Sequence, residues 1–219
     1  MAANLDAIVE RIRGDLERKN AVRDLTLSRS RALIRFCANS IRATHRHEYD
    51  LARELLGAAR AAAEEMCADA QAYPDIYYAG YLQDALKEMA EAAITLALAS
   101  RQDLPEPEML GVPSAAYLNG LGEAMGEMRR FALDSVRRGE LEEAERVLEI
   151  MDEVYLVLVT MDFPDALTGG LRRTTDMVRG VTERTRGDLT TTIEQEKLQA
   201  ALRRFEARLD VRLAGHGDA

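Results

Sequence analysis

Four glutamates stand at helical spacing in two stretches of the chain that are otherwise rich in small and apolar residues. They are Glu88, Glu91, Glu123 and Glu127. Glutamate is rarely buried without a partner, and carboxylates held close together repel one another unless a cation lies between them. Hard oxygen ligands of this kind suit Mg²⁺ or Mn²⁺, which can orient water and neutralise charge that develops on a phosphate. The spacing therefore raises the hypothesis of a divalent metal site that hydrolyses phosphodiester bonds.

Each pair of glutamates shares one face of its predicted helix. A step of three residues leaves Glu88 and Glu91 about 60° apart around the helix axis, and a step of four leaves Glu123 and Glu127 about 40° apart. Two helices packed side by side can therefore place four carboxylates around one cavity. The same spacing is common on exposed helices, so two alternatives stay open: solvated surface charges, or charges in an interface between subunits.

The sequence lacks the ligand patterns of other metal centres that are built on helices. A di-iron carboxylate bundle needs Glu-x-x-His pairs on two helices, whereas the histidines are His45, His47 and His216. His45 and His47 point to different sides of a helix, and we predict that they have a structural role in a connection. Cys37 and Cys67 lack metal-ligand spacing and are expected to be reduced thiols in the interior.

The composition predicts an all-α protein. Hydrophobic residues make up 47% of the 219 residues, with only 5 prolines and 14 glycines, as is typical of long helices around a sizeable core. We expect six or seven helices in one antiparallel bundle. The last helical segment is predicted to be interrupted near Gly187, which would divide it into two helices. The domain is predicted to span residues 1–214, with a frayed tail at 215–219. The helical segments are 5–46, 49–70, 77–99, 115–138, 141–161 and 171–213.

Three glycines fall inside one predicted helix, the one that carries Glu123. They are Gly120, Gly122 and Gly126. Each costs about 1 kcal/mol relative to alanine in a helix interior. We therefore expect another helix backbone to approach this surface closely.

The net charge of −9 argues against a surface that is basic everywhere, the simplest form of a nucleic-acid-binding protein. In the first predicted helix, however, arginines outnumber acidic residues. Arginine offers a planar set of donors to phosphate oxygens, so this helix is either a phosphate-facing stripe or a solvated face. The arginines that we assign to nucleic-acid binding are Arg29, Arg35, Arg42 and Arg46.

Two further groups of side chains bear on ligand binding. The last predicted helix offers a second basic surface, and the helix that carries Glu88 begins with tyrosines at helical spacing. The tyrosines either stack on bases or pack in the core, and the sequence leaves both open. The residues are Arg172, Arg173, Arg179, Arg184 and Arg186, and Tyr77, Tyr78 and Tyr81.

No apolar run approaches the length that spans a bilayer. The first ten residues are amphipathic and acidic, unlike a signal peptide. We therefore expect a soluble, cytoplasmic protein with no membrane partner.

Several segments follow one another in an order and spacing that resemble the translin/Trax family, and Trax more closely than translin. Lys87-Glu88-Met89-Ala90-Glu91-Ala92 resembles the Trax stretch Gln-Glu-Tyr-Val-Glu-Ala, and Phe131-Ala132-Leu133-Asp134-Ser135-Val136 is similar to the family's Phe-Ala-Ile-Asn-Ser-Val. The resemblance extends from about residue 23 to residue 188. Its other parts are residues 23–29, 41–46, 122–129, 139–140 and 171–176.

The resemblance implies an all-α, translin-like fold in a closed homo-oligomer, commonly an octamer, that binds single-stranded RNA or DNA. For a Trax-like member it implies a Mg²⁺-dependent endoribonuclease, with Mn²⁺ as a possible substitute. The acidic cluster, catalytic and metal-binding, corresponds to Glu88, Glu91, Glu123 and Glu127. With nucleic acid inside the assembly, we expect an acidic exterior and an interior lined by the four arginines of the first helix.

One departure from the family pattern concerns Glu123, where Trax has aspartate. The carboxylate is kept but extended by one methylene, which can displace the metal. A translin-like assembly that binds single-stranded nucleic acid without cutting it is therefore the alternative to the nuclease.

Overall fold

The computed structural model describes the backbone of residues 4–214 and the side chains of residues 4–208. All nine regular elements within that part of the chain are α-helices, which confirms the all-α prediction. The tail 215–219 lies outside the described residues. Six helices are long: α1 (Leu5–His45), α2 (Tyr49–Ala70), α4 (Gly80–Ala99), α6 (Ser114–Arg137), α7 (Leu141–Val159) and α9 (Leu171–Ala214).

The other three helices have four residues each: α3 (Pro74–Tyr77), α5 (Pro107–Leu110) and α8 (Asp165–Thr168). Each follows or begins with a proline, whose fixed φ suits a first helical turn. These single turns are too short to show an apolar period, which is why the sequence predicted six or seven helices rather than nine.

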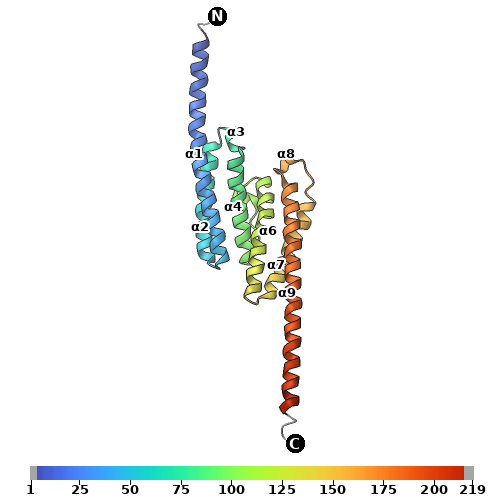
Figure 1. Cartoon of the computed structure of the whole chain (residues 1–219). Helices are drawn as coiled ribbons and strands as arrows, with labels where there is room; N and C mark the ends of the chain where they lie inside the picture. Colours follow the sequence, from blue (N-terminus) through green and yellow to red (C-terminus); the bar gives the residue numbers. More distant parts are fainter. Residues whose placement is uncertain (1–3, 215–219) are drawn as a thin grey trace.

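The long helices lie side by side in the order α1 and α2, α4, α6, then α7 and α9 (Figure 1). The first turns of α1 and the last turns of α9 project from opposite ends of this body. Buried residues of all six long helices form one main core, which includes Leu33, Met89, Met125 and Met151. Helices α4 and α6 are the central pair, and they carry the glutamates.

The predicted interruption of the last helix is wrong, because α9 runs without a break from Leu171 to Ala214. Gly187 is exposed, and nothing outside its own helix lies within 4 Å of the position of its absent Cβ. A single glycine costs an exposed helix only about 1 kcal/mol, which is too little to end a helix of this length. In residues 4–214, no helix combines the length and apolarity that crossing a bilayer requires.

Candidate metal centre

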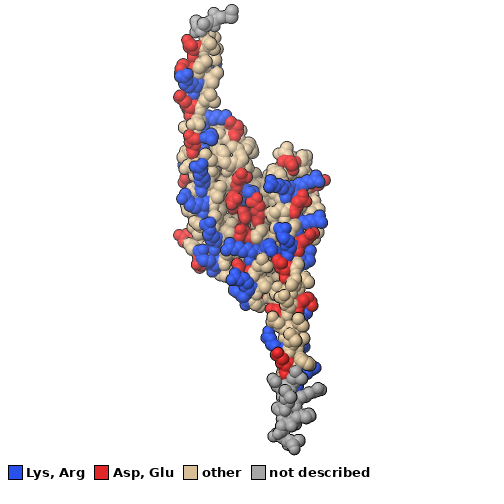
Figure 2. Space-filling view, viewed as in Figure 1, with Lys and Arg blue, Asp and Glu red and all other residues tan. Residues whose placement is uncertain are grey.

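Three of the four predicted glutamates converge. One carboxylate oxygen from each of Glu88, Glu91 and Glu123 lies within 4.8 Å of the other two, and all three side chains are half-buried. We call these three residues the carboxylate cluster. Figure 2 shows acidic side chains gathered over α4 and α6 at the centre of one face, with Lys and Arg side chains on both sides.

Close approach of α4 and α6 brings the cluster together. A Cβ at Gly120 would lie 2.7 Å from the Lys87 carbonyl oxygen and 2.9 Å from the Glu91 nitrogen, so only glycine fits there. Gly120 stands one turn before Glu123 on α6. It therefore lets α6 rest on the backbone segment of α4 that carries the other two glutamates.

The neighbouring glycines differ from one another. A Cβ at Gly122 would lie 2.3 Å from Thr174 Cγ2, so Gly122 allows α6 to approach α9. Gly126 is exposed and has nothing within 4 Å. The expected approach of another backbone is thus confirmed at Gly120, whereas Gly122 packs closely against side chains of α7 and α9. The expectation is wrong at Gly126, which lies on the open side of the helix.

Burial and mutual repulsion set the pKa values in the cluster. Burial, and then the charges of the neighbouring carboxylates, raise the pKa of Glu91 to about 8. Burial also raises the pKa of Glu88, although the charge of Lys87 opposes the shift. Both shifts mean that the protein disfavours the negative charge of these carboxyls. Three hard oxygen donors held this close together fit a divalent cation, because the cation would offset their mutual repulsion.

Glu127 lies beside the cluster and is held by a histidine. His45 Nε2, at the end of α1, lies 2.5 Å from Glu127 Oε2, and the His45 side chain is only 3% exposed. The hydrogen bond with His45 lowers the pKa of Glu127. The charge of Glu127 still reaches Glu91, whose pKa it helps to raise.

From the sequence, we expected His45 to have only a structural role in the connection between two helices, and its contact with Glu127 was not predicted. His45 and Glu127 are 82 residues apart, so nothing in their local spacing relates them. The only available indication was that a histidine near the end of a long helix can turn back toward the core.

Lys87 is a second residue that the sequence analysis missed. Its Nζ lies 2.7 Å from Glu123 Oε1 and 4.0 Å from Glu88 Oε1. Burial disfavours the charge of Lys87, but the hydrogen bond with Glu123 and the surrounding acidic groups outweigh that effect and raise its pKa. An ammonium group of the protein therefore already neutralises part of the carboxylate cluster.

Three of the four arginines assigned to nucleic-acid binding lie on α1, and Arg46 directly follows its last residue. Arg29 is held in ion pairs with Glu65 and Asp69 of α2, at 2.8 and 3.1 Å. Arg35 and Arg42 are exposed and share one face of α1, because a step of seven residues brings a helix back to within about 20°. Arg46 is exposed and forms an ion pair with Glu48 at 2.6 Å. The role of the four arginines in binding stays a prediction.

The three tyrosines, which lie at the end of α3 and the start of α4, divide between the two alternatives. Tyr77 and Tyr81 are half-buried and pack against the core, and the Tyr81 hydroxyl lies 2.9 Å from Thr26 Oγ1. Tyr78 is 72% exposed, with its ring edge-to-face against Tyr77. Only Tyr78 is therefore free to stack on a ligand.

Comparisons with known proteins relate the whole chain to one group. A protein of Methanocaldococcus jannaschii, described as uncharacterised, is 30% identical over 196 residues, which cover 89% of this chain and 86% of that protein. AfC3PO has been solved as a crystal structure and in complex with duplex RNA. It is 32% identical to this chain with a TM-score of 0.77, and the match covers 85% of this chain and 97% of AfC3PO. No protein-family model matches the chain.

A further solved structure, apo-NeC3PO, is 23% identical with a TM-score of 0.74, over 88% of this chain and 98% of that one. This likeness concerns the fold alone. The agreement along nearly the full length of each neighbour means that the central helices, α4 and α6, belong to a shared fold.

Proposed function

This chain belongs to the translin/Trax family, as AfC3PO does, and we propose from that membership that it binds single-stranded RNA or DNA and cleaves RNA with Mg²⁺. The proposed metal ligands are the carboxylate cluster of Glu88, Glu91 and Glu123. Mn²⁺ is expected to substitute. The observation that carries the proposal is the approach of three carboxylate oxygens from two helices to within 4.8 Å of one another.

When bound, Mg²⁺ would stabilise negative charge on the phosphate and activate water for hydrolysis. The carboxylate cluster would hold the cation at the open face of α4 and α6. A site of this kind does not need a nucleophilic side chain, because the attacking group is water.

Glu127 is the proposed proton acceptor for the attacking water. Its Oε2 is engaged by His45 Nε2 at 2.5 Å, which leaves Oε1 for a second partner. Its lowered pKa keeps the carboxylate ionised at neutral pH. In the metal-free protein Glu91, with a pKa of about 8, holds its proton. Glu91 must therefore release its proton to act as a metal ligand, whereas Glu127 is already ionised.

The nucleic-acid part of the proposal has support of its own from the solved relatives. AfC3PO has been solved in complex with duplex RNA. In this chain, exposed Lys and Arg side chains flank the acidic centre on both sides (Figure 2). Positive side chains beside a metal site can position the phosphate backbone that the site cleaves.

We also propose that the chain forms the closed homo-oligomer, an octamer, that the family resemblance implies. Two exposed apolar stripes support self-association, because their four- and three-residue steps match helix-to-helix packing. They lie on the projecting ends of α1 and α9 (Figure 1). Their residues are Leu5, Val9, Ile12 and Leu16 on α1, and Leu198, Leu202 and Phe205 on α9.

A translin-like protein that binds without cleaving is the second candidate, and one contact favours it. Lys87 Nζ lies 2.7 Å from Glu123 Oε1, so the ammonium group competes with a metal for one of the three ligands. Glu123 is also the residue that is one methylene longer than the family's aspartate. If the ion pair persists at millimolar Mg²⁺, the cluster cannot act as a metal site.

Incubation of a labelled single-stranded RNA with the protein, in Mg²⁺ or in EDTA, separates the two candidates. The nuclease proposal expects cleavage in Mg²⁺ only, and a loss of at least about 100-fold in Glu91→Gln. Glu149→Gln, which removes an exposed carboxylate of α7, is the matched control and should cleave normally. RNA that is retained but not cut by any of the three proteins would establish the binding function instead.

A further inference from the structure

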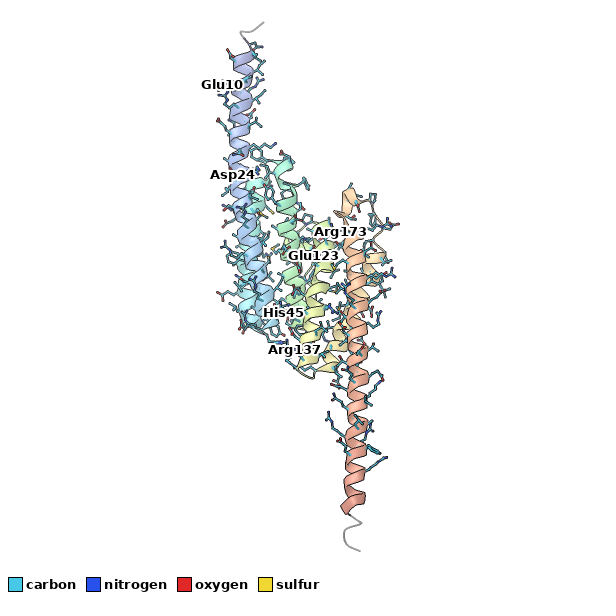
Figure 3. The ribbon with its side chains drawn as sticks, in the orientation of Figure 1. Glu10, Asp24, His45, Glu123, Arg137 and Arg173 are labelled. Atoms are coloured by element: carbon cyan, nitrogen blue, oxygen red, sulfur yellow. The ribbon has the colours of Figure 1, made fainter. Side chains whose placement is uncertain are left out.

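A groove of about 1000 Å³ lies between α4, α6 and the first turns of α9. Lys87 and Glu123, the ion pair at the carboxylate cluster, line its α4 and α6 sides. Arg173 lines the α9 side, and Tyr78 lies at the α3 end of α4. Figure 3 shows Glu123 and Arg173 at a similar level on neighbouring helices. The groove therefore begins at the cluster and leads away from it.

Arg173 is the cation that the groove offers to a ligand. It is exposed, and within residues 4–208 no ion pair or side-chain hydrogen bond engages its guanidinium group. The preceding residue, Arg172, is exposed as well but does not line the groove. Two adjacent arginines of the same helical turn thus differ in a single respect, their access to the groove.

Backbone groups at the start of α6 add to the positive character of the groove. Its first residues, Ser114 to Ala116, line the groove, as do Gly169, Gly170, Arg173 and Thr174 beside the start of α9. The amides in the first turn of α6 have no acceptor within the helix, and the helix dipole favours anions there. The amides of Arg173 and Thr174 already donate to the Gly170 carbonyl oxygen. The acidic residues of the groove, Asp84 and Glu123, come from α4 and α6, and Glu123 is paired with Lys87.

The floor of the groove is fixed by one buried side chain, Asn119. Its Nδ2 donates to the carbonyl oxygens of Ala115 and Thr168, each at 2.8 Å, and its Oδ1 accepts from Thr174 Oγ1 at 2.6 Å. Asn119 thereby ties α6, α8 and α9 together. The groove is preorganised, so binding does not require these helices to be ordered first.

Tyr78 supplies an aromatic surface at the rim. Its side chain is 72% exposed, and its edge-to-face contact with Tyr77 holds the ring in place. An exposed ring beside a groove with an unpaired arginine suits a single strand, because an unpaired base can stack on the ring while a phosphate meets the arginine. A paired base inside a duplex cannot stack on a side chain in this way.

We propose that this groove seats the single-stranded segment next to the cleaved bond, with Arg173 binding a backbone phosphate and Tyr78 stacking on an unpaired base. The inference rests on the proposed function and deepens it, since it assigns the path of the strand. Under this proposal, the preference for single-stranded over double-stranded nucleic acid comes from Arg173 and Tyr78, which lie outside the carboxylate cluster.

The test is binding of a labelled single-stranded RNA in EDTA, where binding is measured without cleavage. Arg173→Gln is expected to bind about tenfold more weakly, as loss of one charge-assisted contact predicts, and to reduce the salt dependence of binding by about one phosphate contact. Arg172→Gln, the matched control, should bind like the unaltered protein. Tyr78→Ala is expected to lose about five- to tenfold in affinity, and Tyr78→Phe, which keeps the ring, should lose little.

The outcomes separate this inference from the function beneath it. Equal effects of Arg172→Gln and Arg173→Gln would mean that only overall charge matters, and would overturn the groove. So would unchanged RNA binding by Arg173→Gln and Tyr78→Ala; an altered elution volume in gel filtration would then identify the groove as a subunit interface. If the unaltered protein binds no single strand at all, the proposed function fails, and the groove assignment with it.

Discussion

His45 Nε2 lies 2.5 Å from Glu127 Oε2, across 82 residues of chain, and links the end of α1 to the middle of α6. Within residues 4–208, His45 Nδ1 is buried without a hydrogen-bond partner. The contact thus fixes both the direction of the Glu127 carboxylate and the identity of its free oxygen.

Replacing His45 should therefore affect turnover more than metal binding. His45→Ala frees the Glu127 carboxylate to rotate, and we expect kcat for RNA cleavage to fall about tenfold while KM and Mn²⁺ affinity stay close to normal. His45→Gln places an amide donor near the position of Nε2 and should recover most of the loss. Steady-state kinetics check this; equal activity of all three proteins would exclude a positioning role.

The metal-free protein should lose stability as the pH rises. Glu91 has a folded-state pKa of about 8 against 4.5 in an unfolded chain, so the folded state binds its proton more tightly than the unfolded state does. That contribution is complete below about pH 4.5 and is lost as the pH passes through 8. Glu88, whose pKa is also raised, acts in the same direction.

Thermal unfolding in EDTA between pH 5 and pH 9 measures this effect. We expect the midpoint to fall with rising pH in the unaltered protein, and to fall less in Glu91→Gln, which carries no charge at this position. Added Mn²⁺ should restore the midpoint at pH 8, because ligand binding stabilises the folded state. Identical pH profiles for the two proteins in EDTA would show that Glu91 is not the titrating group.

Adding one methyl group to Gly120 should separate α4 from α6. The new Cβ would lie 2.7 Å from the backbone oxygen of Lys87. Gly120→Ala is therefore expected to destabilise the protein by about 1–3 kcal/mol in urea unfolding. Gly126→Ala is the matched control on the same helix, where nothing lies within 4 Å, and should stabilise by about 0.4–1 kcal/mol. Effects of the same sign at both positions would contradict the packing argument.

Removing the Lys87 ammonium group should strengthen metal binding. Lys87→Gln abolishes the ion pair with Glu123, and we expect Mn²⁺ affinity in calorimetry to rise by about tenfold, as loss of one competing charge predicts. Lys197→Gln, which breaks an exposed pair with Glu194 on α9, controls for the change in net charge. Weaker binding in Lys87→Gln would mean that the lysine supports the site.

Much of this molecule follows from its sequence. Helical periodicity and the few proline and glycine positions predicted the six long helices, because each buries one apolar stripe against a neighbour. Spacing also placed Glu88 and Glu91 on one face. Close approach of another helix at glycines such as Gly120 was predictable, since glycine inside a helix costs free energy that close packing offsets.

The contacts between distant segments were not predictable. Lys87 lies on the same helix as Glu88 and Glu91, yet its partner Glu123 lies on α6. His45 reaches Glu127 only because α1 packs on α4, which in turn packs on α6. Such pairs depend on the packing of three helices, and the sequence pattern of any one helix does not contain them.

The most direct test of the central claim is the position of Mn²⁺ in crystals of the protein, located by its anomalous scattering. We predict one strong peak per chain within coordination distance of the carboxylate oxygens of Glu88, Glu91 and Glu123. The Lys87 ammonium group should then have moved away from Glu123. A carboxylate cluster without a peak at saturating Mn²⁺, with the Lys87–Glu123 pair intact, would contradict the claim that these glutamates form a metal centre.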